Sequence, residues 1–352
     1  MWERACPRLP AIERSPHHLC RKHTINPTPS THTPSQQNHW YVLGAGAMGC
    51  LWAARLAQHG ATVTLLLRGA GDLRRHAEAG SQITLEDAGG LQRIPVPAQI
   101  AAEVTMPIQQ LLIATKAQDV EAALASVRHA IATHTRIVLL QNGIKAQRRA
   151  SAEFGAQRVY CLSTSQGAWV RAPLHVVHAG SGETWLGQLG HADPVDPVDP
   201  ALLQSLPVAA MGIRTDPNIE ARLWRKLAIN CAVNALTVIY DCRNGELLTH
   251  PQARIDLLAL CAEIESIYAA LPEPPTLHDL VGQVDAVLTA TAQNFSSTLQ
   301  DFRRGKVSEL SQLNGYLCEL ARSHRLDCSV NEAIVQRLDM QSALRDQLKS
   351  ID

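Results

Sequence analysis

The segment His39-Trp-Tyr-Val-Leu-Gly44-Ala-Gly46-Ala-Met-Gly49 decides the fold, because a short β-prone run passes directly into a Gly-x-Gly-x-x-Gly turn. Residues 50–59 then follow a helical pattern, Gly60 ends it, and residues 61–67 form a second β-prone run. The order of strand, glycine turn, helix and strand predicts a βαβ unit that binds a dinucleotide.

Each glycine of this turn has its own expected task. Gly44 permits the tight turn, Gly46 lets backbone approach a pyrophosphate, and Gly49 lets helix and strand pack closely. The helix N-terminus adds amide groups and a favourable dipole for the phosphates. The predicted cofactor-binding backbone is therefore Gly44, Ala45, Gly46, Ala47, Met48 and Gly49.

Arg68 stands at the end of the second predicted strand, where an NAD-binding chain usually has an Asp or Glu for the ribose 2′-hydroxyl. No carboxylate follows until Asp72. A guanidinium at this place matches a 2′-phosphate, and a charge-assisted hydrogen bond would favour NADP roughly ten- to a hundredfold. The alternative is a solvated arginine at a strand end.

Two further predicted strands also end in polar residues. Residues 110–115 run into Lys116, and residues 136–140 run into Gln141, Asn142 and Gly143. Parallel strands end at the same edge of a sheet, so Lys116 and Asn142 are expected to face the nicotinamide and the substrate. Taken alone, either could be an ordinary turn residue.

The composition changes after residues 216–218, and the remainder is predicted to be helical. Periodic segments cover residues 219–240, 250–270, 276–293, 309–323 and 331–348. We therefore predict three parts: a disordered Pro/His-rich extension at 1–38, a Rossmann-type NADP-binding domain at 39–217, and an all-α substrate and catalytic domain at 218–352. The repeat of Asp-Pro at residues 193–200 is predicted to be an exposed loop.

The first long helical segment carries Lys226, Asn230 and Asn234 at i, i+4 and i+8, so the three polar side chains share one stripe. The rest of this helix is apolar. Asn is unfavourable inside a helix, and a lysine among apolar neighbours must reach water, a counter-charge or a ligand. We predict that the stripe lines a substrate cleft. The alternative is a packed helix with a snorkelling lysine and two solvated amides.

The amino-acid composition limits the classes of binding partner that can be expected. Lys plus Arg and Asp plus Glu are equal at 32 each among 352 residues, which gives no support for nucleic-acid binding and favours a small-molecule substrate. No apolar run approaches the ~20 residues that span a bilayer. We therefore expect a soluble protein. The nine cysteines have no metal-ligand spacing, so we expect no metal site. Reduced buried thiols are expected instead, which fits the cytoplasm. A homodimer is kept open as the oligomeric state.

Together these residues resemble the ketopantoate reductase family. The likeness runs from residue 40 to the C-terminus and depends on the glycine turn, Arg68, residues 115–117, 141–143, 223–234, 244–246, 296–301 and Glu309. It implies NADPH-dependent reduction of 2-dehydropantoate to pantoate, toward pantothenate and coenzyme A. Gln118 and Asp119 depart from the pattern, since many members have an aromatic residue after this lysine.

The resemblance also implies roles for residues. Lys226 would donate the proton to the ketone oxygen, and Glu309 would engage the substrate hydroxyl, support Lys226 and contact the cofactor. Lys116 and Asn142 would line the cofactor and substrate cleft. The residues implied in substrate binding are Asn142, Asn230, Asn234, Asn244 and Ser297.

The chemistry of the residues agrees with these roles. Hydride addition to a ketone builds negative charge on oxygen, which calls for a cation or a proton donor such as Lys226. Glu309 would keep that lysine charged against burial. Alone, Glu309 could be a helix-start carboxylate and Ser297 an N-cap. Two other functions stay open: reduction of a different 2-oxoacid or a β-hydroxyacid couple, and an NADPH-binding regulator without catalysis.

Overall fold

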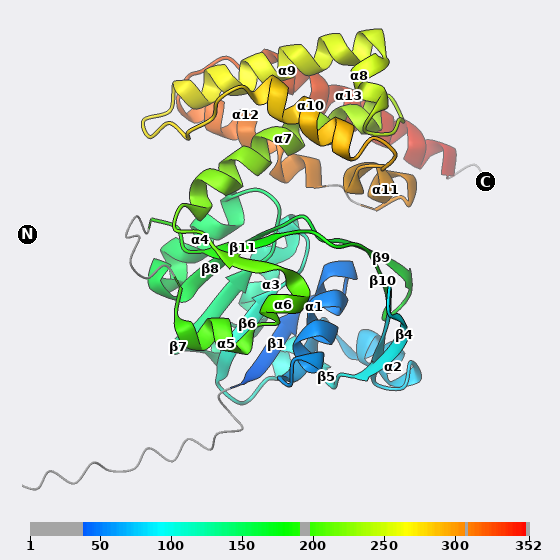
Figure 1. The fold of residues 1–352 in the computed structure, drawn as a ribbon, viewed down its shortest axis with the longest axis vertical. Coiled ribbons are helices and arrows are strands. Elements are labelled where there is room, and N and C mark those ends of the chain that lie inside the picture. The colour runs from blue at the N-terminus through cyan, green and yellow to red at the C-terminus, as the bar shows by residue number, and fades with distance from the viewer. Residues whose placement is uncertain (1–37, 191–197, 307–308, 350–352) are drawn as a thin grey trace, which may run out of the picture. The chain divides into compact units, whose positions relative to one another are not determined.

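The computed structural model describes residues 38–190, 198–306 and 309–349, which all lie in one compact unit. The extension predicted for residues 1–38 therefore lies outside the described residues, except for Asn38. Most of the Asp-Pro repeat lies outside them too. The described residues form two β-sheets followed by a series of helices (Figure 1).

The larger sheet has eight strands in the order β12-β11-β8-β7-β6-β1-β2-β5. Its strands are β1 (His39–Leu43), β2 (Thr62–Leu67), β5 (Ala98–Ile100), β6 (Ile108–Ile113), β7 (Ile131–Leu139), β8 (Val159–Thr164), β11 (Thr184–Gly187) and β12 (Ile213–Thr215). Those from β5 to β8 along the sheet are parallel, and β11 is antiparallel to β8. The chain goes from β1 to β2 on one side and later returns to β6 on the other. Open α/β sheets bind ligands at such a reversal.

Helices connect the strands of this sheet. They are α1 (Ala47–Gln58), α2 (Ala70–Glu78), α3 (Val120–Val127), α4 (Lys145–Phe154), α5 (Pro200–Ser205) and α6 (Val208–Met211), with the short 3-10 turns η2 (Ala101–Glu103), η3 (Ala117–Asp119), η4 (Arg128–Ala130) and η5 (Ala156–Arg158). The predicted strand, glycine turn, helix and strand are confirmed as β1, α1 and β2. The strand predicted over residues 136–140 begins earlier, at Ile131, and ends at Leu139.

A second sheet was not predicted from the sequence. It has the order β4-β3-β10-β9, made of β3 (Gln82–Asp87), β4 (Gly90–Pro95), β9 (Gly167–Ala172) and β10 (His175–Gly180). Its residues Ile83 and Val176 belong to the same apolar cluster as Trp52 of α1. Because residues of both sheets pack against α1, Trp52 is fully buried.

All elements after β12 are helical. They are α7 (Ile219–Ile239), α8 (Glu246–Thr249), α9 (Pro251–Ala269), α10 (Leu280–Ala290), α11 (Ser297–Arg303), the 3-10 turn η6 (Glu309–Gln312), α12 (Asn314–Ser323) and α13 (Ser329–Lys349). The long predicted segments correspond to α7, α9, α10, α12 and α13, whereas α8 and α11 were not predicted. The fold class, a Rossmann-type α/β region followed by an all-α region, is confirmed. The domain boundary at 217/218 stays a prediction.

Helix α7 lies in the core of the helical region. Leu227, Cys231 and Leu236 are fully buried there and share one apolar cluster with residues of α9, α10, α12 and α13. Asn314 at the start of α12 ties these helices together, because its Nδ2 donates to the backbone oxygen of Cys231 and to Oδ1 of Asn331, each at 2.9 Å. The apolar faces of α7 therefore fix the direction of its polar stripe.

The cysteines and the apolar helices of the described residues bear on two predictions made from composition. The cysteines among them are all unpaired and buried, as expected for reduced thiols. Within these residues, no helix is long and apolar enough to cross a bilayer.

Candidate active site

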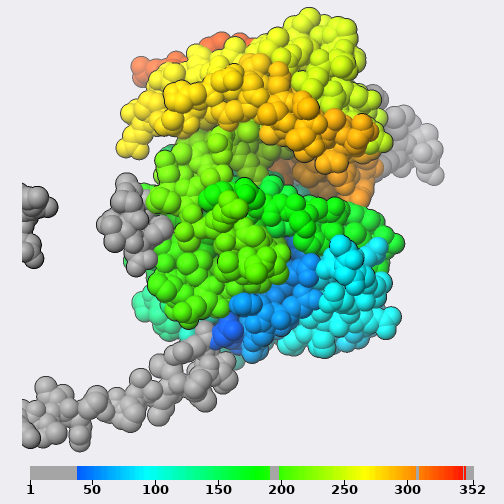
Figure 2. Space-filling view, viewed as in Figure 1, coloured from blue at the N-terminus to red at the C-terminus, as the bar shows by residue number. Residues whose placement is uncertain are grey.

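A cleft of about 1650 Å³ lies at the carboxyl ends of the parallel strands. Its lining includes the start of α1 together with residues of α7, α11 and η6. Figure 2 shows the surface hollowed between green and orange segments, and the lining residues come from both, 164–170 and 293–304. The predicted site residues that line it are Gly44, Ala45, Gly46, Ala47, Met48, Arg68, Lys116, Asn142, Lys226, Asn230, Asn234, Ser297 and Glu309.

The glycine turn has the geometry that dinucleotide binding requires. Gly44 has φ +110°, and a Cβ there would lie 2.9 Å from the backbone nitrogen of Thr115. A Cβ on Gly49 would lie 1.8 Å from the backbone oxygen of Gly44, so only glycine fits between helix and strand. A Cβ on Gly46 would meet no atom within 4 Å, because that side of the turn opens into the cleft.

The start of α1 is suited to phosphate. Gly46 is its N-cap residue, and no side chain caps the first turn. First-turn amides of a helix have no partner within the helix, and the dipole adds partial positive charge there. The buried Oγ1 of Thr115, which also lines the cleft, has no hydrogen-bond partner among the described residues. The turn therefore fits a pyrophosphate, and Thr115, which follows β6, has one further hydroxyl without a protein partner.

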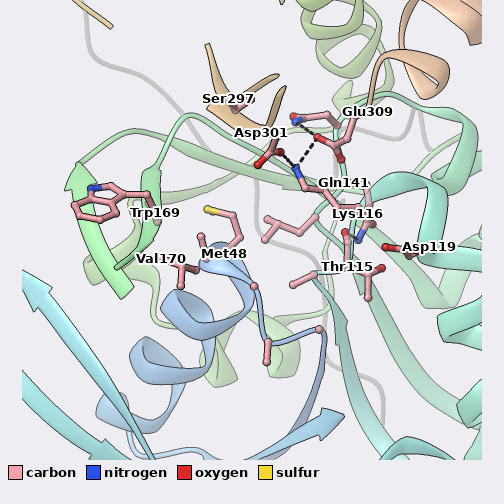
Figure 3. A pocket seen from close by; sticks show the side chains of 18 of the residues that line it. Met48, Thr115, Lys116, Asp119, Gln141, Trp169, Val170, Ser297, Asp301 and Glu309 are labelled. Atoms are coloured by element: carbon pink, nitrogen blue, oxygen red, sulfur yellow. Dashed lines mark hydrogen bonds and ion pairs between the residues drawn. The ribbon is translucent and has the colours of Figure 1, made fainter. Parts of the chain in front are cut away.

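Lys116 lies between two carboxylates, as Figure 3 shows. Its Nζ is 2.5 Å from Oδ2 of Asp301 on α11 and 3.6 Å from Oε2 of Glu309. Burial lowers the pKa of Lys116, but the charges of Glu309 and Asp301 outweigh burial and raise that pKa above its ordinary value. Lys116 is thus a fixed cation that joins the sheet edge to the helical region.

Glu309 is the first residue of η6, and its side chain reaches the sheet edge. Its Oε1 accepts from the backbone N–H of Ala117 at 3.2 Å, and its Oε2 accepts from Nδ2 of Asn142 at 3.4 Å. The side chain thus holds both Lys116 and Asn142 in place. The alternative that Glu309 begins a helical turn describes its position correctly, but the carboxylate is also part of the cleft.

Lys226 points its amine toward the end of β8. Its Nζ donates to the backbone oxygen of Thr164 at 2.8 Å. Burial lowers the pKa of Lys226 to about 8, and the charge of Glu309 opposes this only in part. Desolvation is therefore the larger effect, and the charge of Glu309 limits it, so that the amine keeps its proton below about pH 8. A pKa near 8 suits a proton donor at neutral pH.

The two asparagines of the stripe also reach the cleft. Asn234 is buried and Asn230 is half-buried, and both line it. Among the described residues, neither amide group has a side-chain hydrogen bond to the protein. Because both amide groups line the cleft without a partner from the protein, they can donate to and accept from a polar ligand there. The stripe therefore faces the cleft, and the role of its two amides in substrate binding stays a prediction.

Two predicted residues lie differently from expectation. Asn244 does not line the cleft: its Nδ2 donates to Oγ1 of Thr291 at 2.9 Å, and the residue is buried at the turn before α8. Ser297 lines the cleft and is exposed, but the N-cap of α11 is Ser296, whose Oγ accepts from the backbone N–H of Leu299. Reading Ser297 as the N-cap was therefore wrong by one residue.

Arg68 lines the cleft directly after β2. Its side chain is 77% exposed, and Nη2 lies 3.0 Å from Oδ2 of Asp119 in η3. The guanidinium therefore has an ionic partner from the protein itself, which the sequence analysis did not anticipate.

Comparison with known proteins decides the family. Residues 40–191 match the family described as "Ketopantoate reductase PanE/ApbA", and residues 218–342 match its C-terminal part. The chain belongs to the ketopantoate reductase family. The 2-dehydropantoate 2-reductase of Escherichia coli O157:H7 is 31% identical over 296 residues, 84% of this chain and 92% of that protein. The Vibrio cholerae enzyme of the same name is 30% identical over 298 residues, 84% of this chain and 95% of that protein.

Solved structures agree with the ketopantoate reductase fold. The 2-dehydropantoate 2-reductase of Geobacter metallireducens superimposes with a TM-score of 0.74 at 21% identity and covers 86% of this chain and 99% of that one. D-mandelate dehydrogenase with NADH and anilino(oxo)acetate reaches 0.76 at 21% identity, with 87% and 98% covered. These structures show a shared fold, and membership of an oxidoreductase family follows from the relatives that are 30% and 31% identical.

Sequence reasoning missed several lining residues of this ketopantoate reductase family member, among them Asp119, Asp301 and Thr164. Asp301 had been noted only as part of a motif, although its position four residues after Ser297 places both on one face of α11. Thr164 acts through its backbone oxygen, so its side chain gave no signal. The described residues also contain no group of three or more His, Cys, Asp or Glu that could hold a metal ion.

Proposed function

We propose that this chain reduces 2-dehydropantoate to (R)-pantoate with NADPH in the cytoplasm, as a step toward pantothenate and coenzyme A. One observation carries the proposal: Lys226, with a pKa of about 8, shares a cleft with the glycine turn and with unpaired amides on its own helix. A cation, hydrogen-bond donors and a dinucleotide site in one cleft are what ketoacid reduction requires.

In this proposal the turn at residues 44–49 holds the pyrophosphate, and Arg68 meets the 2′-phosphate. Lys116 and Asn142, fixed by Glu309, line the nicotinamide end. When bound, the cofactor supplies hydride to the carbonyl carbon. These residues fit the cofactor because the turn is open at Gly46 and the helix start has no capping side chain.

The substrate is held by the stripe on α7 and by α11. Asn230 and Asn234 donate to its polar groups without adding a second charge, and Ser297 contacts its carboxylate end. Glu309 accepts from the substrate hydroxyl. Lys226 then exchanges its hydrogen bond to Thr164 for one to the ketone oxygen and gives up a proton from Nζ as negative charge develops there.

A panel of 2-oxoacids with the full-length chain tests this proposal. NADPH absorbance is followed with 2-dehydropantoate, pyruvate, 2-oxoisovalerate and phenylglyoxylate at equal concentrations. We expect the highest kcat/KM with 2-dehydropantoate. Failure with that substrate and turnover of another would replace it by the second candidate, a reductase of a different 2-oxoacid. Binding of NADPH without turnover of any ketoacid would favour the regulator.

A further inference from the structure

Two charged pairs lie at the end of the cleft beside β2. Arg68 pairs with Asp119, and Arg75 of α2 pairs with Asp72 of the same helix. All four side chains line the cleft. Two guanidinium groups and two carboxylates therefore cancel in formal charge at the place where the ribose of the adenosine half would lie in this fold.

The pairing of Arg68 matters for the 2′-position of that ribose. A 2′-phosphate gains most from a guanidinium whose donors are not already taken, and it is repelled by a carboxylate nearby. Oδ2 of Asp119 lies 3.0 Å from the guanidinium, so a phosphate at Arg68 would compete with it. A 2′-hydroxyl behaves in the opposite way, because it can donate a hydrogen bond to a carboxylate.

Asp119 lies at an unusual position for a carboxylate that could bind the ribose 2′-hydroxyl. Rossmann folds that use NAD usually place it at the end of the second strand, where this chain has Arg68. Here it is the last residue of η3, which follows β6, and it reaches the same end of the cleft from the other side of β1.

We infer that Asp119 is a specificity-determining residue that reduces the preference for NADPH over NADH. Through its pair with Arg68 it gives the chain measurable affinity for both cofactors. This inference rests on the proposed function, because it takes Arg68 as the residue that meets the 2′-phosphate.

A purely structural role for this pair is poorly supported by its surroundings. The side chains are 77% and 38% exposed, and exposed ion pairs contribute little to stability. Asp119 precedes α3 as its N-cap residue but makes no side-chain capping bond. Removing its charge should therefore leave the fold unchanged.

The test is Asp119→Asn in the full-length chain, with dissociation constants for NADPH and NADH measured by fluorescence titration. We expect the Kd ratio to shift about three- to tenfold in favour of NADPH, as loss of one exposed like charge predicts. The kcat/KM ratio should shift in the same direction. The matched control is Glu121→Gln, which removes the same charge two residues later, where the carboxylate pairs with Arg149 and both side chains are exposed.

Arg68→Gln separates failure of this inference from failure of the proposed function. Suppose that Arg68→Gln weakens the binding of NADPH much more than that of NADH, while Asp119→Asn shifts the ratio of the two dissociation constants no more than Glu121→Gln does. The role of Asp119 is then refuted, and the role of Arg68 in binding the 2′-phosphate stands. If Arg68→Gln weakens both cofactors equally, the phosphate role and the inference both fail. A shift confined to Asp119→Asn, with Arg68→Gln selective for NADPH, supports both.

Discussion

Lys226→Met should stabilise the fold while removing the proton donor. The pKa of Lys226 falls from 10.5 to about 8 on folding, mainly through burial. A tenfold change in proton affinity corresponds to about 1.4 kcal/mol, so holding this ammonium in the cleft costs about 3 kcal/mol below pH 8. Losing the hydrogen bond to Thr164 costs about 1 kcal/mol. The expected net gain is about 2 kcal/mol at pH 7.

The pH dependence of this gain identifies its origin. Between pH 8 and 10.5 the unfolded chain binds more protons at this lysine than the folded chain does, so wild-type stability rises with pH. The methionine variant lacks this rise. Its advantage should therefore be fully present below pH 8 and should disappear by about pH 10.5.

Equilibrium denaturation in guanidinium chloride at pH 7 and pH 10 measures the difference in free energy of unfolding between Lys226→Met and wild type at each pH. Arg225→Met is the control, since it removes an exposed charge from the adjacent position of α7. We expect its effect to be within about 0.5 kcal/mol at both pH values. A Lys226→Met variant that is less stable than wild type at pH 7, or that keeps the same difference at both pH values, would refute the desolvation argument.

Three further outcomes follow from the site. Turnover should fall as pH rises through about 8, because Lys226 then loses the proton that it donates; a rate that stays level to pH 9.5 would speak against this role. Asn234→Ala should raise KM for the ketoacid about tenfold and leave the Kd of NADPH unchanged, which titration and kinetics together can check. Gly49→Ala should abolish cofactor binding and lower the melting temperature, because its Cβ would lie 1.8 Å from the backbone oxygen of Gly44; unchanged binding would contradict that geometry.

Residue spacing and hydrophobic periodicity predicted those parts of the fold that depend on neighbouring residues in the sequence. The glycine turn, the long helices and the stripe on α7 follow from spacing and periodicity, and each lies where it was expected. The second sheet was not predicted, because its strands are short and β10 pairs with β3 from far away in the sequence. A two-residue turn before Gly90 was a signal for the β3–β4 hairpin that could have been recognised.

The candidate site shows the same division. Lys226 and Asn234 could be assigned to the cleft because one helix carries both. The partners of Lys116 and Arg68 could not, since Asp301 and Asp119 meet them only through tertiary contact. Asn244 was included through the family pattern, but its amide is used by Thr291 instead. The sign of the pKa change at Lys226 depended on how much burial outweighs Glu309, which requires the folded environment.

The measurement that tests the account most directly is single-turnover reduction of 2-dehydropantoate by Lys226→Ala with NADPH bound in advance. The account predicts a rate about 10²- to 10⁴-fold below wild type with a Kd for NADPH within about twofold, because the lysine belongs to α7 and not to the glycine turn. A rate within about threefold of wild type, at normal NADPH affinity, would contradict the claim that this amine delivers the proton.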